Sequence, residues 1–104
     1  MRSCQLAPDA DALILFGSYC ANDLSASGLP VLSISGANDG LSTPEKIAAA
    51  RHLLPEDADL VEIEGANHAS FGDYGPQPGD GPVTISDEDM AAELTSLVAE
   101  FFDR

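Results

Sequence analysis

The apolar residues of the chain gather in three short runs, which polar, Gly- and Pro-containing segments keep apart. These runs cover residues 12–16, 31–35 and 60–63. Each is only four or five residues long and is rich in Leu, Ile and Val, which is typical of short strands. The first run, from Ala12 to Phe16, is unbroken. We expect it to form a strand that is buried on both faces.

A helix is predicted between the second and third runs. Ser42 supplies a capping hydroxyl, Pro44 falls in the first turn, and Glu45 follows Ser42 by three residues. This pattern marks a helix start, and we expect the helix to cover 44–54 and to stop before Pro55. Its inner face would carry Ile47, Ala50 and Leu54.

A second helix closes the chain. Ser86 and Asp89 form its cap, and acidic residues crowd its first turn, as the helix dipole favours. An apolar stripe follows, made of Met90, Leu94, Leu97, Val98, Phe101 and Phe102. The order of elements is therefore strand, connector, strand, helix, strand, helix. It predicts an α/β fold with a small three-stranded parallel sheet and flanking helices, in one domain over 1–104.

Composition and charge narrow the possible partners. With 44% hydrophobic residues the chain is too apolar for disorder, and 18 acidic residues against 4 basic ones give a net charge of −14. The negative electrostatic field of such a chain disfavours binding to nucleic acid and to anionic membrane surfaces. No apolar run approaches the length of a membrane span, and no secretion signal is expected. Cys4 and Cys20 are only two thiols, so we expect them to be reduced, in a cytoplasmic protein.

One short phrase occurs twice in the sequence. Ile-Ser-Gly-Ala-Asn-Asp ends at Asp39, and Ile-Glu-Gly-Ala-Asn-His ends at His68, 29 residues later. That spacing is the length of one strand-helix-strand unit. The two copies should therefore end neighbouring parallel strands, and the carboxyl ends of such strands are where α/β proteins place their chemistry. We expect Asp39 and His68 to meet there, as the acid and base of a serine-hydrolase triad do.

In this order the motifs resemble the C-terminal half of an α/β-hydrolase, close to the dienelactone-hydrolase-like and general esterase branch. Residues 35–44 match the acid loop of that family and residues 64–75 match its histidine loop. The resemblance implies that 1–104 is a partial α/β-hydrolase domain, that Asp39 and His68 are catalytic, and that 12–16 is the sixth strand. It further implies hydrolysis of a small-molecule carboxylic ester, with no cofactor.

The nucleophile of that family is not found in the printed sequence. Members carry Gly-x-Ser-x-Gly on a strained strand-to-helix turn, and no Ser or Cys here has Gly two residues away on both sides. The nearest match surrounds Ser42, where Pro44 replaces the second Gly. We therefore expect either a fragment of a longer protein or a site that a partner chain completes.

Other side chains offer alternatives. Ser18 lies just past the first run and is either a turn hydroxyl or a substitute nucleophile, whereas Ser70 is too close to His68 in sequence to face it easily. Cys20 would act as a thiolate only beside a cation, and basic residues are few. His52 is expected to face solvent.

Simpler interpretations of the pair also stay open. Asn-Asp-Gly is strong turn chemistry, so Asp39 alone is consistent with a turn residue, and His68 alone with a loop residue. A metal site made of Asp39, His68 and Asp73 has weak support, because one His with two carboxylates at unfixed spacing is a poor signal. No metal or cofactor is expected.

The absent fifth strand of the family suggests a partner. A sixth strand from Ala12 to Phe16 without that neighbour would be an apolar, unprotected edge. We expect the chain to form a homo-oligomer along it, by an isologous twofold contact. Two hypotheses follow: an esterase-like hydrolase, or an inactive truncated module that folds by self-association. A long Gly- and Pro-rich loop between His68 and Ile85 would cover the site.

Overall fold

The three apolar runs form the strands of one parallel sheet. The computed structural model describes residues 11–71 and 79–103. Their elements are β1 (Leu13–Phe16), β2 (Val31–Gly36), α1 (Pro44–Ala49), the 3-10 helix η1 (Arg51–Leu53), β3 (Asp59–Ile63), the 3-10 helix η2 (His68–Phe71) and α2 (Asp87–Phe102). The strands lie in the order β1-β2-β3 and all pairs are parallel. The predicted α/β fold with its three-stranded parallel sheet is confirmed.

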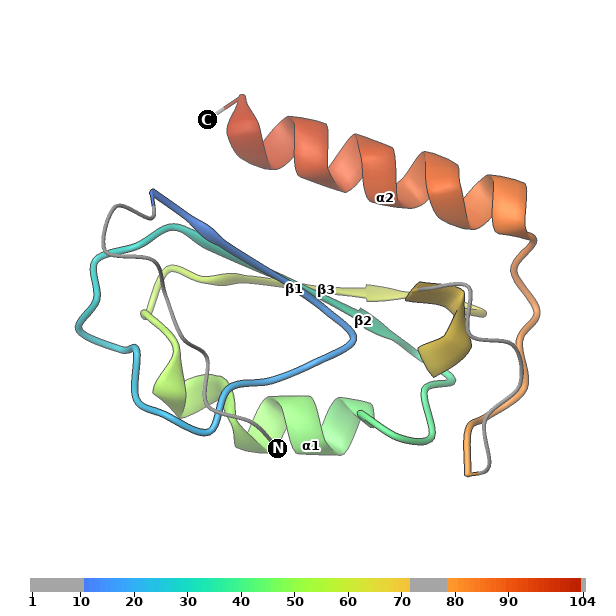
Figure 1. Ribbon diagram of the computed structural model, residues 1–104, viewed down its shortest axis with the longest axis horizontal. Coiled ribbons are helices and arrows are strands. Elements are labelled where there is room, and N and C mark those ends of the chain that lie inside the picture. The colour runs from blue at the N-terminus through green and yellow to red at the C-terminus, as the bar shows by residue number, and fades with distance from the viewer. Residues whose placement is uncertain (1–10, 72–78, 104) are drawn as a thin grey trace.

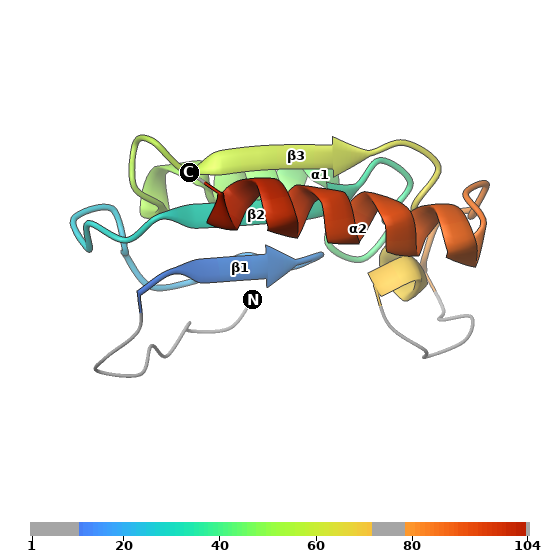
Figure 2. The same ribbon diagram turned by 90° about the horizontal axis from the view of Figure 1, so that it is seen from above.

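The sheet lies between two helical layers, with α2 on one face and α1 on the other (Figure 1). Seen from above, α2 runs along the strands of the sheet, in the direction opposite to theirs (Figure 2). The central strand β2 is buried along its whole length. Alternate side chains of a strand point to opposite faces, so Leu32 and Ile34 join the core under α2, and Val31 joins a second core on the α1 side.

The register of the sheet differs from the sequence repeat. Ile34 of β2 lies opposite Val61 of β3, and Gly36 lies opposite Ile63. Paired residues are thus 27 apart in sequence (61 − 34), while the repeated phrases are 29 apart (63 − 34). The second copy of the phrase therefore extends two residues farther along the sheet than the first.

The helix over 44–54 is shorter than predicted, and its cap is a different residue. The α-helix ends at Ala49, and η1 continues to Leu53. Thr43, not Ser42, is the N-cap: its Oγ1 accepts from Lys46 N at 3.2 Å. The amide of Ser42 is instead bound by Asp39. The inner face is as predicted, because Ile47, Ala50 and Leu54 are all buried.

The last helix begins as predicted and buries most of its stripe. Ser86 Oγ accepts from Asp89 N at 3.1 Å, and three acidic residues occupy the first turn. Met90 and Phe101 are buried against the sheet. Phe102 is an exception at 65% exposed, because it lies on the outer side of the helix, with its ring edge-on to Phe101. No helix within residues 11–71 and 79–103 is long and apolar enough to cross a membrane.

Two expectations about the N-terminal part are corrected. Strand β1 is not buried on both faces: Leu15 is buried, but Phe16 is 44% exposed, because β1 lies at the edge of the sheet. Cys20 is not a free thiol but is disulfide-bonded, and its side chain is buried among Leu15, Leu24 and Val31. The sequence separation of two cysteines does not reveal their distance in space. Cys4 lies outside the described residues.

Two leucines on neighbouring strands test the importance of the core under α2. Leu32 is 2% exposed and Leu60 is 38% exposed. We expect Leu32→Ala to lower the free energy of unfolding by roughly 2–4 kcal/mol, because it removes buried methyl groups and leaves a cavity. Leu60→Ala, the matched control, should cost less than about 1 kcal/mol. Urea denaturation measures both, and equal losses would contradict this assignment of the core.

Candidate active site

The site is built where the two repeated Gly-Ala-Asn turns pack against each other. Asn38 N donates to Ala66 O at 2.9 Å, and Ala37 N donates to Ile63 O at 3.0 Å. This approach requires a glycine at position 36, since a Cβ there would lie 2.5 Å from Ala66 O. The turns therefore hold the residues that follow them, Asp39 and His68, side by side.

Asp39 is a buried carboxylate whose two oxygens are both engaged. The residue is 3% exposed. Its Oδ1 accepts from Leu41 N and Ser42 N, each at 2.8 Å, and its Oδ2 lies 2.9 Å from His68 Nδ1. Hydrogen bonds from backbone amides stabilise the charged form of a carboxylate. Asp39 is thus both a turn residue and a fixed hydrogen-bond acceptor for the imidazole.

His68 opens η2, beside the carboxyl ends of β2 and β3 (Figure 1). Its side chain is 26% exposed, whereas that of Asp39 is fully covered. A carboxylate at Nδ1 favours the tautomer that carries its proton on Nδ1. Nε2 is then left as the acceptor. The expected juxtaposition of Asp39 and His68 is present in the structure, in the form of an oriented imidazole beside a buried carboxylate.

Asp80 is a site residue that the sequence pattern did not reveal. Its Oδ1 accepts from the backbone amides of Gly40 (3.1 Å), His68 (3.0 Å) and Gly81 (2.9 Å), and its Oδ2 accepts from that of Ala69 (3.0 Å). Partial burial raises the pKa of Asp80, but these backbone donors outweigh it and hold the pKa below its ordinary value. In the sequence Asp80 is one more acidic residue in a Gly- and Pro-rich loop, where no spacing marks its role.

Asn67, the last residue of the second turn, also connects this turn to the segment that carries Asp80. Asn67 Nδ2 donates to Gly81 O at 3.0 Å, and Asn67 Oδ1 accepts from Ser70 N at 3.0 Å. A Cβ on Gly81 would collide with Asn38 O, and one on Gly40 would collide with Gly79 O. The segment 79–81 is therefore packed closely against both turns.

The alternative nucleophiles are not brought to His68. Among the described residues, the ring of His68 has a hydrogen bond to Asp39 and none to a serine. Ser70 Oγ donates to Asn67 Oδ1, and Ser42 offers its amide to Asp39. The alternative of a Cys20 thiolate is excluded by the disulfide of this residue. Ser18 follows Gly17, which the ring of Phe71 covers, and has no hydrogen bond to the imidazole.

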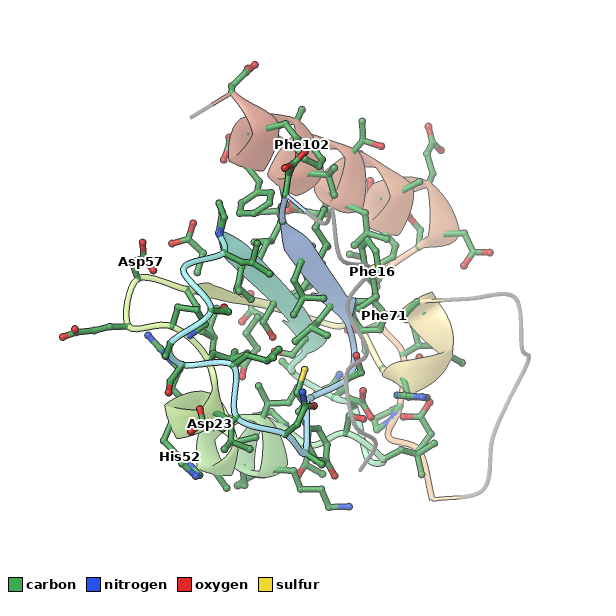
Figure 3. All side chains as sticks on the ribbon, turned by 60° about the vertical axis from the view of Figure 1, so that its left-hand side comes forward. Phe16, Asp23, His52, Asp57, Phe71 and Phe102 are labelled. Atoms are coloured by element: carbon green, nitrogen blue, oxygen red, sulfur yellow. The ribbon has the colours of Figure 1, made fainter. Side chains whose placement is uncertain are left out.

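The remaining candidates lie elsewhere. His52 is exposed, as predicted, and belongs to η1. Figure 3 shows it beside Asp23 and well apart from Phe71, the last residue of η2. Asp73 lies outside the described residues. Within the parts of the chain that are described, no group of three or more His, Cys, Asp or Glu side chains is arranged to hold a metal.

Sheet and site together define an α/β protein with an acid–base pair at the carboxyl edge of its strands. The chain belongs to the alpha/beta hydrolase family, because the model of that family matches residues 3–92. This confirms the family resemblance; the esterase branch stays a prediction. No curated protein matches the chain. No solved structure matches it either.

A substitution at Gly36 tests the contact between the two turns. Gly36→Ala would place its Cβ against Ala66 O, so we expect a loss of about 1–3 kcal/mol in unfolding free energy and a displaced His68 ring. Gly28→Ala is the control: its Cβ meets open space, and its φ of 73° alone accounts for its cost, roughly 1–2 kcal/mol.

Urea denaturation gives the stability of both variants, and the NMR signals of the His68 ring report its position. If Gly36→Ala leaves those ring signals where Gly28→Ala does, the turn contact does not position the histidine.

Proposed function

We propose that this chain carries the acid and base of carboxylic-ester hydrolysis, with Asp39 as the acid partner and His68 as the general base. The observation that carries the proposal is the 2.9 Å contact between His68 Nδ1 and Asp39 Oδ2. A buried, amide-bound carboxylate orients a part-exposed imidazole at the edge where parallel sheets bind their substrates. Family membership supports hydrolysis as the reaction class.

The chemistry follows from the tautomer. His68 Nε2 takes the proton of an attacking hydroxyl while the hydroxyl oxygen bonds to the acyl carbon of the ester. Asp39 stabilises the imidazolium that forms. The imidazolium then gives this proton to the oxygen of the leaving alcohol as the carbon–oxygen bond breaks. Low pH opposes the reaction, since a protonated imidazole accepts nothing.

The proposed reaction also needs a group that supplies the attacking hydroxyl. No serine of the printed sequence lies in Gly-x-Ser-x-Gly, and none in the described part is bonded to His68. We propose that His68 acts on a serine presented from outside these 104 residues, or on water. The substrate class is a small-molecule ester, and the net charge of −14 disfavours polyanionic substrates.

The two histidines of the chain allow a matched test. With a short-chain chromogenic ester, we expect the purified chain to turn over above background and His68→Ala to lose at least about 100-fold in rate. His52→Ala removes the same side chain from an exposed position in η1 and should keep the full rate. Initial rates of the three proteins, prepared identically, measure the effect. Equal rates for wild type and His68→Ala would refute the proposal for the chain on its own.

A second candidate function is a non-catalytic module that self-associates, and the edge strand β1 favours it. Leu13 N donates to Pro30 O and Gly17 N to Ile34 O, so the amides of Ile14 and Phe16 point away from β2, toward the side where no other described strand lies. An apolar pocket lies beside this edge, lined by Phe16, Leu94, Thr95, Val98 and Ala99. Figure 3 shows Phe16 and Phe102 on this side of the molecule.

The other edge of the sheet is protected. Strand β3 carries Asp59 and Glu62, and charged residues discourage pairing between edges. Strand β1, Leu-Ile-Leu-Phe, has no charge. A second copy of the chain would therefore pair at β1.

The direction of pairing separates the two candidate functions. A twofold axis makes two β1 strands antiparallel, which places the partner's amino-terminal end, not its carboxyl end, beside the site. Such a dimer would cover the β1 edge, but residues at the carboxyl edge of the partner's sheet would not reach the Asp39–His68 site. A strand that delivers a nucleophile has to run parallel to β1.

Lysine on either edge tests self-association. We expect the wild-type chain to be dimeric at micromolar concentration and Phe16→Lys to be monomeric, because a charge on the edge blocks pairing. Leu60→Lys places the same charge on β3 and should leave the dimer intact. Light scattering after size exclusion measures the mass of each. A monomeric wild type, or equal effects of the two lysines, would refute pairing along β1.

A further inference from the structure

The carboxylate of Asp80 links three separate segments of the chain. One oxygen accepts from Gly40, the residue after Asp39, and from His68 itself, and the other accepts from Ala69. Its fourth donor is the neighbouring Gly81. One side chain therefore connects the turn of the acid to the turn of the base, from a position 40 residues away from Gly40.

We propose that Asp80 is a positioning residue for the Asp39–His68 pair, acting as a clasp between the two turns. His68 is held at two points by two carboxylates: Asp80 binds its backbone nitrogen at 3.0 Å, and Asp39 binds its ring Nδ1 at 2.9 Å. The bond to Asp80 fixes the position of the His68 backbone, and the bond to Asp39 sets the orientation of the His68 ring. The assignment rests on the proposed function, because positioning matters to chemistry only if His68 is the base.

The clasp depends on the charge and on both oxygens. Hydrogen bonds to an ionised acceptor are shorter and stronger than those between neutral groups, and a carboxylate has acceptor sites for four donors. A carboxamide of the same shape keeps one acceptor oxygen, but this oxygen is uncharged and binds the amides of Gly40, His68 and Gly81 more weakly. Its amino group would then face the amide of Ala69, donor against donor. Asp80→Asn thus tests the clasp with little change in volume.

In the described part, the surroundings of the Asp80 carboxylate belong to the same two turns. Close packing brings segment 79–81 against Asn38 and Gly40, and Asn67 binds the carbonyl of Gly81. No described cation forms an ion pair with Asp80, so its partners are the four amides. Removing the charge therefore acts on the two turns directly.

Asp23 supplies a matched control. Its Oδ1 also accepts a backbone amide, that of Ser25 at 2.9 Å, together with Ser25 Oγ at 2.6 Å. The turn is local, exposed and distant from η2 (Figure 3). Asp23→Asn removes the same charge from a carboxylate that joins no two segments.

Amide hydrogen exchange followed by NMR, with the Nδ1 proton signal of His68, tests the clasp. We expect Asp80→Asn to speed exchange at Gly40, His68 and Ala69 by about tenfold or more and to broaden or shift the Nδ1 signal. Asp23→Asn should change neither. If the Nδ1 signal stays unchanged in Asp80→Asn, the residue is structural and the inference fails.

The wild-type chain offers a test that does not depend on how the variant folds. If one carboxylate holds both turns, the amides of Gly40, His68 and Ala69 open together and show the same free energy of opening. Clearly different values would overturn the clasp. Both measurements are independent of ester turnover: a positive exchange result with an inactive chain would refute the proposed function and leave the clasp standing.

Discussion

The contact between the two Gly-Ala-Asn turns is the constraint on which the site depends. The hydrogen bond from Asn38 N to Ala66 O joins the ends of neighbouring strands, and it forms because Gly36 has no side chain to hold the turns apart. The two side chains of the candidate site come directly after the turns: Asp39 follows Asn38, and His68 follows Asn67. A parallel sheet supplies the common edge, and the turns convert that edge into a fixed pair of side chains.

Backbone amides take the place of positive side chains in this acidic molecule. Of the basic residues in the described part, Lys46 donates to Leu41 O and Arg51 to the carbonyls of Pro55 and Glu56. The site carboxylates Asp39 and Asp80 are stabilised by N–H groups of their own and neighbouring turns. Because these amides belong to the turns themselves, this arrangement orients both carboxylates without a positive side chain, in a chain with a net charge of −14.

Much of this could be predicted from local patterns. Apolar runs predicted the three strands to within one residue at each end, and the repeat predicted that Asp39 and His68 meet. Features that depend on tertiary contacts were missed. Thr43, not Ser42, caps α1, and Asp39 binds the amide of Ser42; Cys20 forms a disulfide, and Asp80 reaches back across the loop. No spacing or propensity encodes such contacts, since each depends on where distant segments come to lie.

The two-residue offset between the repeat and the sheet register has a further consequence. A strand that slips by two residues keeps every side chain on its original face, so the hydrophobic pattern of β3 does not by itself select the observed pairing. What distinguishes the pairings is the nesting of the turns, which a slip would separate. The residues that assemble the acid–base pair thus also choose the alignment of the last strand. A change in these turns would therefore leave the alignment of β3 ambiguous and would also move His68 relative to Asp39.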